Sequence, residues 1–244
     1  MSDTAPNPAA TTTPVDEPLI VSVSGLRGVV GSSLTPEVAA RYACAFAATL
    51  PPGPILLGRD GRESGPLLAA AIAARLAMAG RDVIDCGVAA TPTVGIAVRE
   101  RAAAGGIQIS ASHNPARYNG MKLFAAAGRV LPAAAGQVVL AAYRQLEARE
   151  AEGVMGPSTA GRVEHFDPTP IHVRLVTALV DVAAIRRRRP RVWIDCGHGA
   201  GSRVAIPLLE ELGCEVIAEG TEPDGRFEHE PEPTAENLAR LLPR

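Results

Sequence analysis

The chain repeats one pattern of local structure, and this repetition constrains its fold more than any other feature. An apolar run, a glycine-rich loop, an amphipathic stretch, a glycine and a second apolar run follow one another in ILLGRDGRESG…LAMAGRDVIDCG and again in VWIDCGHGAG…LLEELGCEVIAEG. Gly80 and Gly213, which end the two predicted helices, lie about 130 residues apart, a spacing typical of duplicated domains. The sequence therefore predicts an α/β protein with mixed sheets sandwiched between helices and two similar βαβ-type domains.

Composition divides the chain into three segments. Residues 1–18 are rich in Pro, Thr, Ala and Asp, and they have neither the basic start nor the apolar stretch of a signal peptide, so we expect a disordered tail. Residues 19–157 contain the first copy of the pattern, and residues 158–244 contain the second. We expect the second domain to be truncated, because Gly213, the apolar run at 215–218 and the helix start in PEPTAENL are typical of the middle of a domain, which leaves it without its last strand.

Hydrophobic periodicity and capping signals place the individual elements. Strands are expected at 19–23, 54–58, 83–86, 107–110, 121–124, 192–196 and 215–218, and helices after 35, 64 and 91 and at 132–150, 172–185 and 204–212. Thr35 and Ser64 are the expected N-caps of the first two helices. The glycine-punctuated stretch SGLRGVVG is expected to be a loop.

Charge and hydropathy exclude several classes of partner. The net charge is −2 and the pI is near 6.2, which favours neither nucleic acid nor an anionic membrane. The run Arg186–Arg191 has no interleaved aromatic residues and follows a predicted helix, so we interpret it as a solvated turn. The most apolar helix candidate is interrupted by Arg75 and is too short to cross a bilayer. Four cysteines without C-x-x-C spacing indicate buried free thiols and a cytoplasmic protein.

The stretch SASHNP, residues 110–115, is the strongest candidate for chemistry. It follows a predicted strand, and loops at the carboxyl ends of strands carry ligands in such sheets. A turn closed by Pro115 would explain the Ser and Asn side chains without any function. Lys122, the only lysine of the chain, lies just beyond it, and a lysine can release a proton where an arginine cannot. Lys122 is therefore a candidate proton-transfer group, although a lysine retained by chance is the alternative.

Other patterns are weaker or missing. Arg27 lies between glycines, where a guanidinium and backbone amides could approach a phosphate. In GRDGRESG, we expect the arginine and aspartate side chains to pair with one another within the domain. The histidines have no metal-ligand spacing, and neither G-x-S-x-G nor the P-loop motif occurs, so zinc and the usual serine hydrolase are disfavoured.

These motifs together resemble the α-D-phosphohexomutase family, which comprises phosphoglucomutase, phosphomannomutase and phosphoglucosamine mutase. The resemblance rests on SASHNPARYNGMK and on SGLRG, GRDGRES, DCGHGAG and PDGRFEHEPEPTAENL, in the family's order and spacing, and it covers residues 19–244. It implies that Ser112 carries a phosphoryl group, which passes to a hexose phosphate and returns from the bisphosphate formed. His113 and Lys122 correspond to proton-transfer and phosphate-contacting groups, and Arg27 to an active-site arginine.

The resemblance also implies Mg²⁺ bound to the phosphate on Ser112, with the remaining ligands expected beyond the end of this chain, where the family has an Asp-Gly-Asp loop. The residues that select glucose, mannose or glucosamine are expected there too, so the sugar is left open, as is the oligomeric state. A non-catalytic phosphosugar- or protein-binding module derived from the family is the alternative function. The intact set of Ser112, His113 and Lys122 favours the enzyme.

Overall fold

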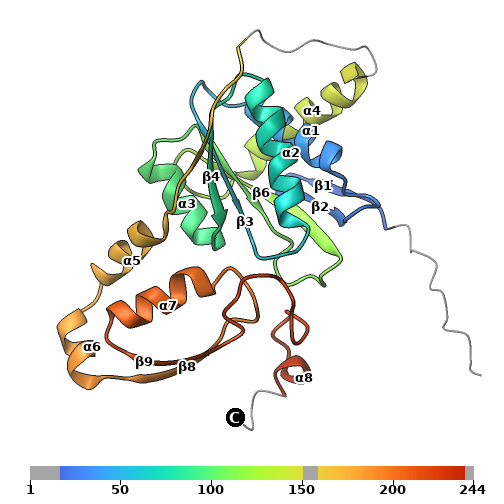
Figure 1. Cartoon of the computed structure of the whole chain (residues 1–244). Coiled ribbons are helices and arrows are strands. Elements are labelled where there is room, and N and C mark those ends of the chain that lie inside the picture. Colours follow the sequence, from blue (N-terminus) through green and yellow to red (C-terminus); the bar gives the residue numbers. More distant parts are fainter. Residues whose placement is uncertain (1–16, 151–158, 240–244) are drawn as a thin grey trace, which may run out of the picture.

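The structure, a computed structural model, describes residues 17–150 and 159–239, and it contains two regions of different size (Figure 1). The expected tail at 1–18 lies almost wholly outside the described residues. We call the region built on the larger sheet the first unit, and residues 169–239, which contain the smaller sheet, the second unit. In Figure 1 the second unit lies below the first.

The first unit is built on a mixed seven-stranded sheet with the order β1-β2-β6-β5-β3-β4-β7. Its strands are β1 (Ile20–Ser22), β2 (Gly25–Val29), β3 (Ile55–Arg59), β4 (Val83–Val88), β5 (Gly105–Ile109), β6 (Tyr118–Ala125) and β7 (Val163–His165). Strands β5, β3, β4 and β7 are parallel, and the edge formed by β1, β2 and β6 is antiparallel. The carboxyl ends of β3, β4 and β5 therefore meet at one edge of the sheet.

Helices cover both faces of this sheet, as expected. They are α1 (Pro36–Ala48), α2 (Gly65–Met78), α3 (Thr91–Glu100) and α4 (Ala133–Glu150). Leu57 and Ile107 pack with α1, α2 and α4 in one core, whereas Leu56 packs with α3 in a second core on the opposite face. This division follows from the pleat of β3, because successive side chains of a strand point to opposite faces.

The second unit has a two-stranded parallel sheet, β8 (Arg191–Asp195) and β9 (Glu215–Glu219). Its helices are α5 (Thr169–Thr177), α6 (Val182–Arg188), α7 (Ser202–Glu211) and α8 (Ala235–Leu238). Figure 1 shows α7 over one face of the sheet. Trp193 and Ile217, which are register partners, are 42% and 37% exposed, so the layering of the first sheet is not matched here among the described residues.

Local signals explain most element ends, with two exceptions. Thr35 caps α1 by accepting a hydrogen bond from the Val38 amide, and Gly80 adopts the left-handed conformation that ends α2. Ser64 makes no capping bond, because its hydroxyl accepts one from the Asn119 amide instead. The single helix expected at 172–185 is two helices, since Asp181 caps α6 and begins a new one.

Two segments extend the first sheet beyond the expected pattern. SGLRGVVG is mostly strand β2, because Gly25 can approach β6 closely: a Cβ there would lie 2.0 Å from the Met121 carbonyl oxygen. Strand β7 follows the expected boundary at residue 157, yet it pairs with β4. The domain boundaries remain predictions.

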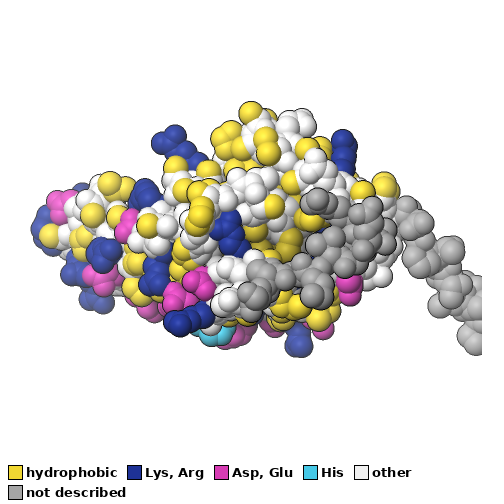
Figure 2. All heavy atoms as spheres, turned by 90° about the horizontal axis from the view of Figure 1, so that it is seen from above, with side chains coloured by type: hydrophobic (Ala, Val, Ile, Leu, Met, Phe, Trp, Pro, Cys, Tyr) yellow, Lys and Arg dark blue, Asp and Glu magenta, His cyan; other side chains and the backbone are white. Residues whose placement is uncertain are grey.

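Surface features follow the sequence in part. Within the described ranges, no helix combines the length and apolar character needed to span a membrane. The run at 186–191 lies at the end of α6, where Arg186 bonds the Glu211 carbonyl and carboxylate, and Arg191 pairs with Glu215. Figure 2 shows basic and acidic side chains interspersed at the end of the molecule that carries α5 and α6. All four cysteines are free, but only Cys86 is buried.

Candidate active site

The SASHNP segment forms the loop between β5 and β6, at the edge where the parallel strands end. Ser112 is exposed on this loop, and its φ of 57° lies in the left-handed region. A residue other than glycine pays about 1–2 kcal/mol for this conformation, so its surroundings must hold it there. The Ser112 amide donates a hydrogen bond to Ser110 Oγ at 3.0 Å, which fixes one side of the residue.

One cleft of about 380 Å³ brings the four predicted site residues together. Ser112 and His113 reach it from the β5–β6 loop, Lys122 from β6 and Arg27 from β2. Because β2 pairs with β6, Arg27 and Lys122 lie on neighbouring strands. Lys122 is half-buried, and its side chain makes no ion pair or hydrogen bond with any described residue. The cleft therefore places two cationic side chains beside an exposed hydroxyl.

Polar groups without negative charge complete the cleft. Ser22 and Ser24 line it from the turn between β1 and β2, and their hydroxyls lie 2.9 Å apart. The His113 Nε2 lies 3.2 Å from a Glu232 carboxylate oxygen of the second unit. Among the described residues that line the cleft, none is Asp or Glu. Its chemistry suits an anion.

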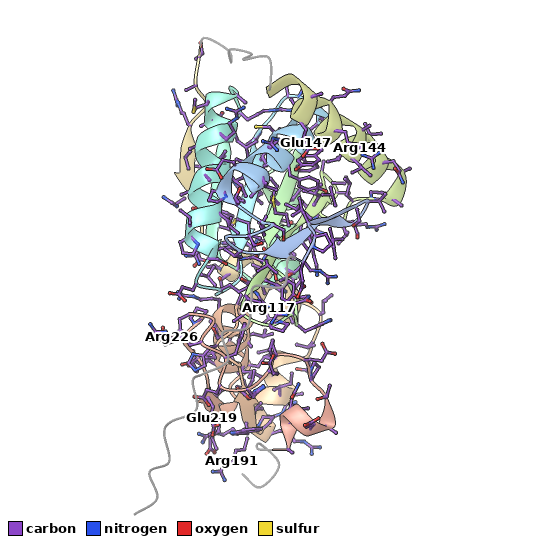
Figure 3. All side chains as sticks on the ribbon, turned by 90° about the vertical axis from the view of Figure 1, so that its right-hand side faces the viewer. Arg117, Arg144, Glu147, Arg191, Glu219 and Arg226 are labelled. Carbon is purple, nitrogen blue, oxygen red and sulfur yellow. The ribbon has the colours of Figure 1, made fainter. Side chains whose placement is uncertain are left out.

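The second unit contacts the Ser112 loop and forms a second cleft with it. This cleft, of about 510 Å³, is lined by Ser112 and by Asp195, Phe227 and His229 of the second unit. Burial alone would raise the pKa of Asp195, but hydrogen bonds from the His229 ring and the Gly197 amide lower it below its ordinary value. Figure 3 shows Arg117, at the end of the Ser112 loop, where the two units meet.

Arg62 is the residue of this site whose role the sequence did not reveal. The expected pairing is confirmed, because its Nε lies 3.2 Å from Asp60 Oδ2. Arg62 is also only 2% exposed, and its remaining donors bond the Ser112 loop. These contacts join residues that are 50 to 56 positions apart in the sequence, so only knowledge that β3 lies beside β5 could have predicted them.

The Mg²⁺ that the resemblance implies lacks a ligand set here. Across residues 17–150 and 159–239, no three His, Cys, Asp or Glu side chains are grouped so that they could hold a metal ion. The lining of the cleft contains no carboxylate, which is the ligand Mg²⁺ prefers. Ser112 alone, through a phosphate, is available from the expected set, so we derive no step through the ion.

Comparison with known proteins assigns the fold to a class of enzymes. Residues 19–150 match the model for phosphoglucomutase/phosphomannomutase, alpha/beta/alpha domain I, and residues 170–243 match alpha/beta/alpha domain II. The chain therefore belongs to the phosphohexomutase family, of which it contains domains I and II.

Individual relatives agree with this assignment. The chain is 36% identical to a phosphoglucomutase/phosphomannomutase of Thermococcus kodakarensis, over 89% of this chain and 48% of that protein. It is 38% identical to a phosphoglucosamine mutase of Synechococcus sp., over 87% and 46%. A solved phosphoglucomutase/phosphomannomutase family structure from Burkholderia thailandensis has a TM-score of 0.73 at 29% identity and covers 92% of this chain and 50% of that one. The chain spans about half the length of the curated relatives it matches.

Proposed function

We propose that the chain provides the phosphoryl-carrying serine of a phosphohexomutase, which interconverts hexose 1-phosphate and hexose 6-phosphate through a phosphoserine enzyme and a bisphosphate. The observation that carries the proposal is the exposed, left-handed Ser112 in a cleft with Arg27, His113 and Lys122 and without a lining carboxylate. The relatives described above, which are phosphohexomutases, support it.

The proposed transfer balances with the residues of this cleft. The bond between phosphorus and Ser112 Oγ breaks as a bond forms between phosphorus and a hydroxyl of the hexose phosphate. Lys122 Nζ takes the proton of that hydroxyl and passes it to Ser112 Oγ, the leaving oxygen, so Ser112 ends the step as a hydroxyl and Lys122 ends it unchanged. Arg27, with its fixed charge, contacts the phosphoryl oxygens, and stabilising the charge spread over those oxygens is the main task in phosphoryl transfer. Returning the other phosphoryl group reverses these changes.

The proposal also covers the substrate, the excluded partners, the location and the metal. The substrate is a hexose phosphate, and neither nucleic acid nor a membrane is a partner. The cytoplasm is the proposed location. Mg²⁺ would neutralise phosphoryl charge beside Ser112 when its remaining ligands are supplied.

Phosphorylation of Ser112 is the direct test. Incubation of the chain with glucose 1,6-bisphosphate or mannose 1,6-bisphosphate should add the mass of one phosphate, measured on the intact protein. Ser112→Ala should abolish the addition, because the accepting hydroxyl is gone. Ser32→Ala is the matched control, since Ser32 is an exposed serine outside this cleft and its loss should leave loading intact.

Two results would overturn the proposal. Addition of phosphate to the Ser112→Ala variant would place the acceptor elsewhere. Failure of the wild-type chain to load, combined with binding of the bisphosphate in calorimetry, would leave the phosphosugar-binding module as the function.

The role of Lys122 can be separated from its charge. Lys122→Arg keeps a cation that cannot be deprotonated, so the rate of Ser112 loading should fall about a hundredfold, nearly as far as in Lys122→Ala. The measurement is the loading rate at saturating bisphosphate. A rate in Lys122→Arg close to the wild-type rate would reduce Lys122 to a phosphate-neutralising cation.

A further inference from the structure

The guanidinium of Arg62 is buried beneath the Ser112 loop. Arg62 lies in the loop between β3 and α2 and is only 2% exposed. A charge is costly to bury unless every donor is paired. Arg62 has five N–H groups, and the structure gives five side-chain contacts to acceptors. One is the carboxylate of Asp60.

The other four acceptors are all main-chain carbonyls, three of the Ser112 loop and one of Tyr118, the first residue of β6. Nη2 donates to the Ser112 carbonyl at 3.0 Å and to the Asn114 carbonyl at 2.6 Å. Nη1 donates to the Pro115 carbonyl at 2.8 Å and to the Tyr118 carbonyl at 3.0 Å. The loop thus turns its carbonyl groups inward around one side chain.

These bonds act on the backbone of Ser112 itself. Its amide is bonded to Ser110 Oγ and its carbonyl to Arg62, so both polar groups of a left-handed residue are fixed. Fixing φ and ψ also fixes the direction of the bond from Cα to Cβ, and hence where the hydroxyl can lie. A lysine at position 62 would keep the charge but not the planar fork that reaches four carbonyls.

The second unit covers Arg62 directly. The Phe227 ring lies 5.2 Å from the guanidinium carbon of Arg62. Close backbone contacts surround this pair: a Cβ on Gly61 would lie 2.4 Å from the Pro223 carbonyl oxygen, and one on Gly225 would lie 2.7 Å from Arg62 Cα. Phe227 therefore belongs to a loop that is seated on Arg62 and keeps water from it.

We propose that Arg62 is a positioning residue that holds Ser112 in its left-handed conformation, and that Phe227 of the second unit secures Arg62 for this purpose. The proposal rests on the proposed function of Ser112 as a phosphoryl acceptor. It assigns the second unit a task in the chemistry of the first: docking of the loop at 223–227 sets the geometry of the phosphoryl-carrying serine.

The experiment compares Arg62→Lys and Phe227→Leu with two matched controls. Arg81→Lys removes a similar set of bonds, because Arg81 also donates to four carbonyls, one at the end of α1 and three in the loop between α1 and β3. Phe166→Leu removes a similar ring contact, that of Phe166 with Arg101. Neither control touches the Ser112 loop.

Two readouts are measured in each full-chain variant. The first is Ser112 loading from glucose 1,6-bisphosphate, followed by intact mass over a range of donor concentrations. In Arg62→Lys and Phe227→Leu the maximal rate should fall, by about a hundredfold in Arg62→Lys, with the half-saturating concentration unchanged. The second is the NMR scalar coupling and carbon shifts of Ser112, which report its φ and should leave their left-handed values. Both controls should keep the wild-type rate and the wild-type Ser112 signals.

The possible results distinguish the positioning role of Arg62 and Phe227 from the phosphoryl-carrying role of Ser112. Unchanged loading and unchanged Ser112 signals in Phe227→Leu would overturn the role of Phe227, and the same result in Arg62→Lys would overturn the whole proposal. If Arg62→Lys does not fold, Phe227→Leu decides. If the wild-type chain does not load, the proposed function fails, and the NMR signals alone decide whether Arg62 and Phe227 hold Ser112.

Discussion

The two units are built from the same strand–loop–helix pattern, but they differ in what stabilises them. The largest fully buried side chains of the described residues all belong to the first unit, including Ile55, Leu56, Leu57, Ile72 and Ile107. In the second unit, Ala200 is the single buried apolar residue among those described. Ion pairs and contacts with the first unit take the place of a core there, so we expect the two units to differ in stability although they share one sequence pattern.

Hydrogen exchange should show the largest difference between the units. Local opening costs less free energy where few apolar contacts are buried, so we expect amides of β8 to exchange at least about a hundredfold faster than those of β3 and β5. The comparison is between the amides of Val192–Cys196, which cover β8 and the residue after it, and those of Leu56–Gly58 and Ile107–Ile109 in β3 and β5. Slower exchange in Val192–Cys196 would refute the contrast.

Paired substitutions should sharpen the same contrast. Ile107 is fully buried and Ile217 is 37% exposed, and both lie at the centre of five-residue parallel strands. Ile107→Ala should lower the free energy of unfolding by about 2–5 kcal/mol, because it removes buried methyl groups and leaves a cavity. Ile217→Ala should cost about 1 kcal/mol or less.

Chemical denaturation followed by circular dichroism gives both values. An Ile217→Ala variant that loses as much stability as Ile107→Ala would mean that the outer face of the second sheet is covered in solution. The two units would then be equally dependent on buried apolar contacts.

The sequence predicted the local parts of this molecule well and the long-range parts poorly. Thr35 and Gly80 act through neighbours a few residues away, and both were assigned correctly. Ser64 is the N-cap residue of α2 as expected, but its hydroxyl makes no capping bond and accepts one from Asn119, 55 residues later. Likewise, SGLRGVVG was taken for a loop because its hydrogen-bonding partner β6 lies about 90 residues further along the chain.

The candidate site shows the same division. SASHNP and Lys122 could be singled out because their residue types are unusual for a strand exit and its return strand. That Arg27 shares their cleft depends on the pairing of β2 with β6, and it was expected only through the family resemblance. The role of Arg62 depends on β3 lying beside β5 and on the second unit docking over both, which no local pattern contains.

The smallest predicted difference between the units is in their response to pH. In the second unit, hydrogen bonding to the Glu230 carbonyl and to the Asp195 carboxylate raises the pKa of His229 above its ordinary value of 6.5. The protonated ring then binds more tightly in the folded state, so its stabilisation is complete below pH 6.5 and is lost as the pH rises through the raised pKa. Opening of the second unit should become easier over that window, by less than about 1 kcal/mol, the range measured for ion pairs near the surface.

Exchange of the Cys196 and Gly197 amides, measured at several pH values and corrected for the intrinsic rate, tests this prediction. These amides bond Glu219 and Asp195 beside the His229 pair. His229→Gln should remove the pH dependence. His172 is the matched control, because burial against the first unit lowers its pKa and reverses the sign of its pH dependence. The stability linked to His172 is complete above pH 6.5 and is lost as the pH falls through the lowered pKa. Equal pH dependence in wild type and His229→Gln would show that ion pairs at this histidine do not compensate for the missing core, and the contrast between the units would then rest on burial alone.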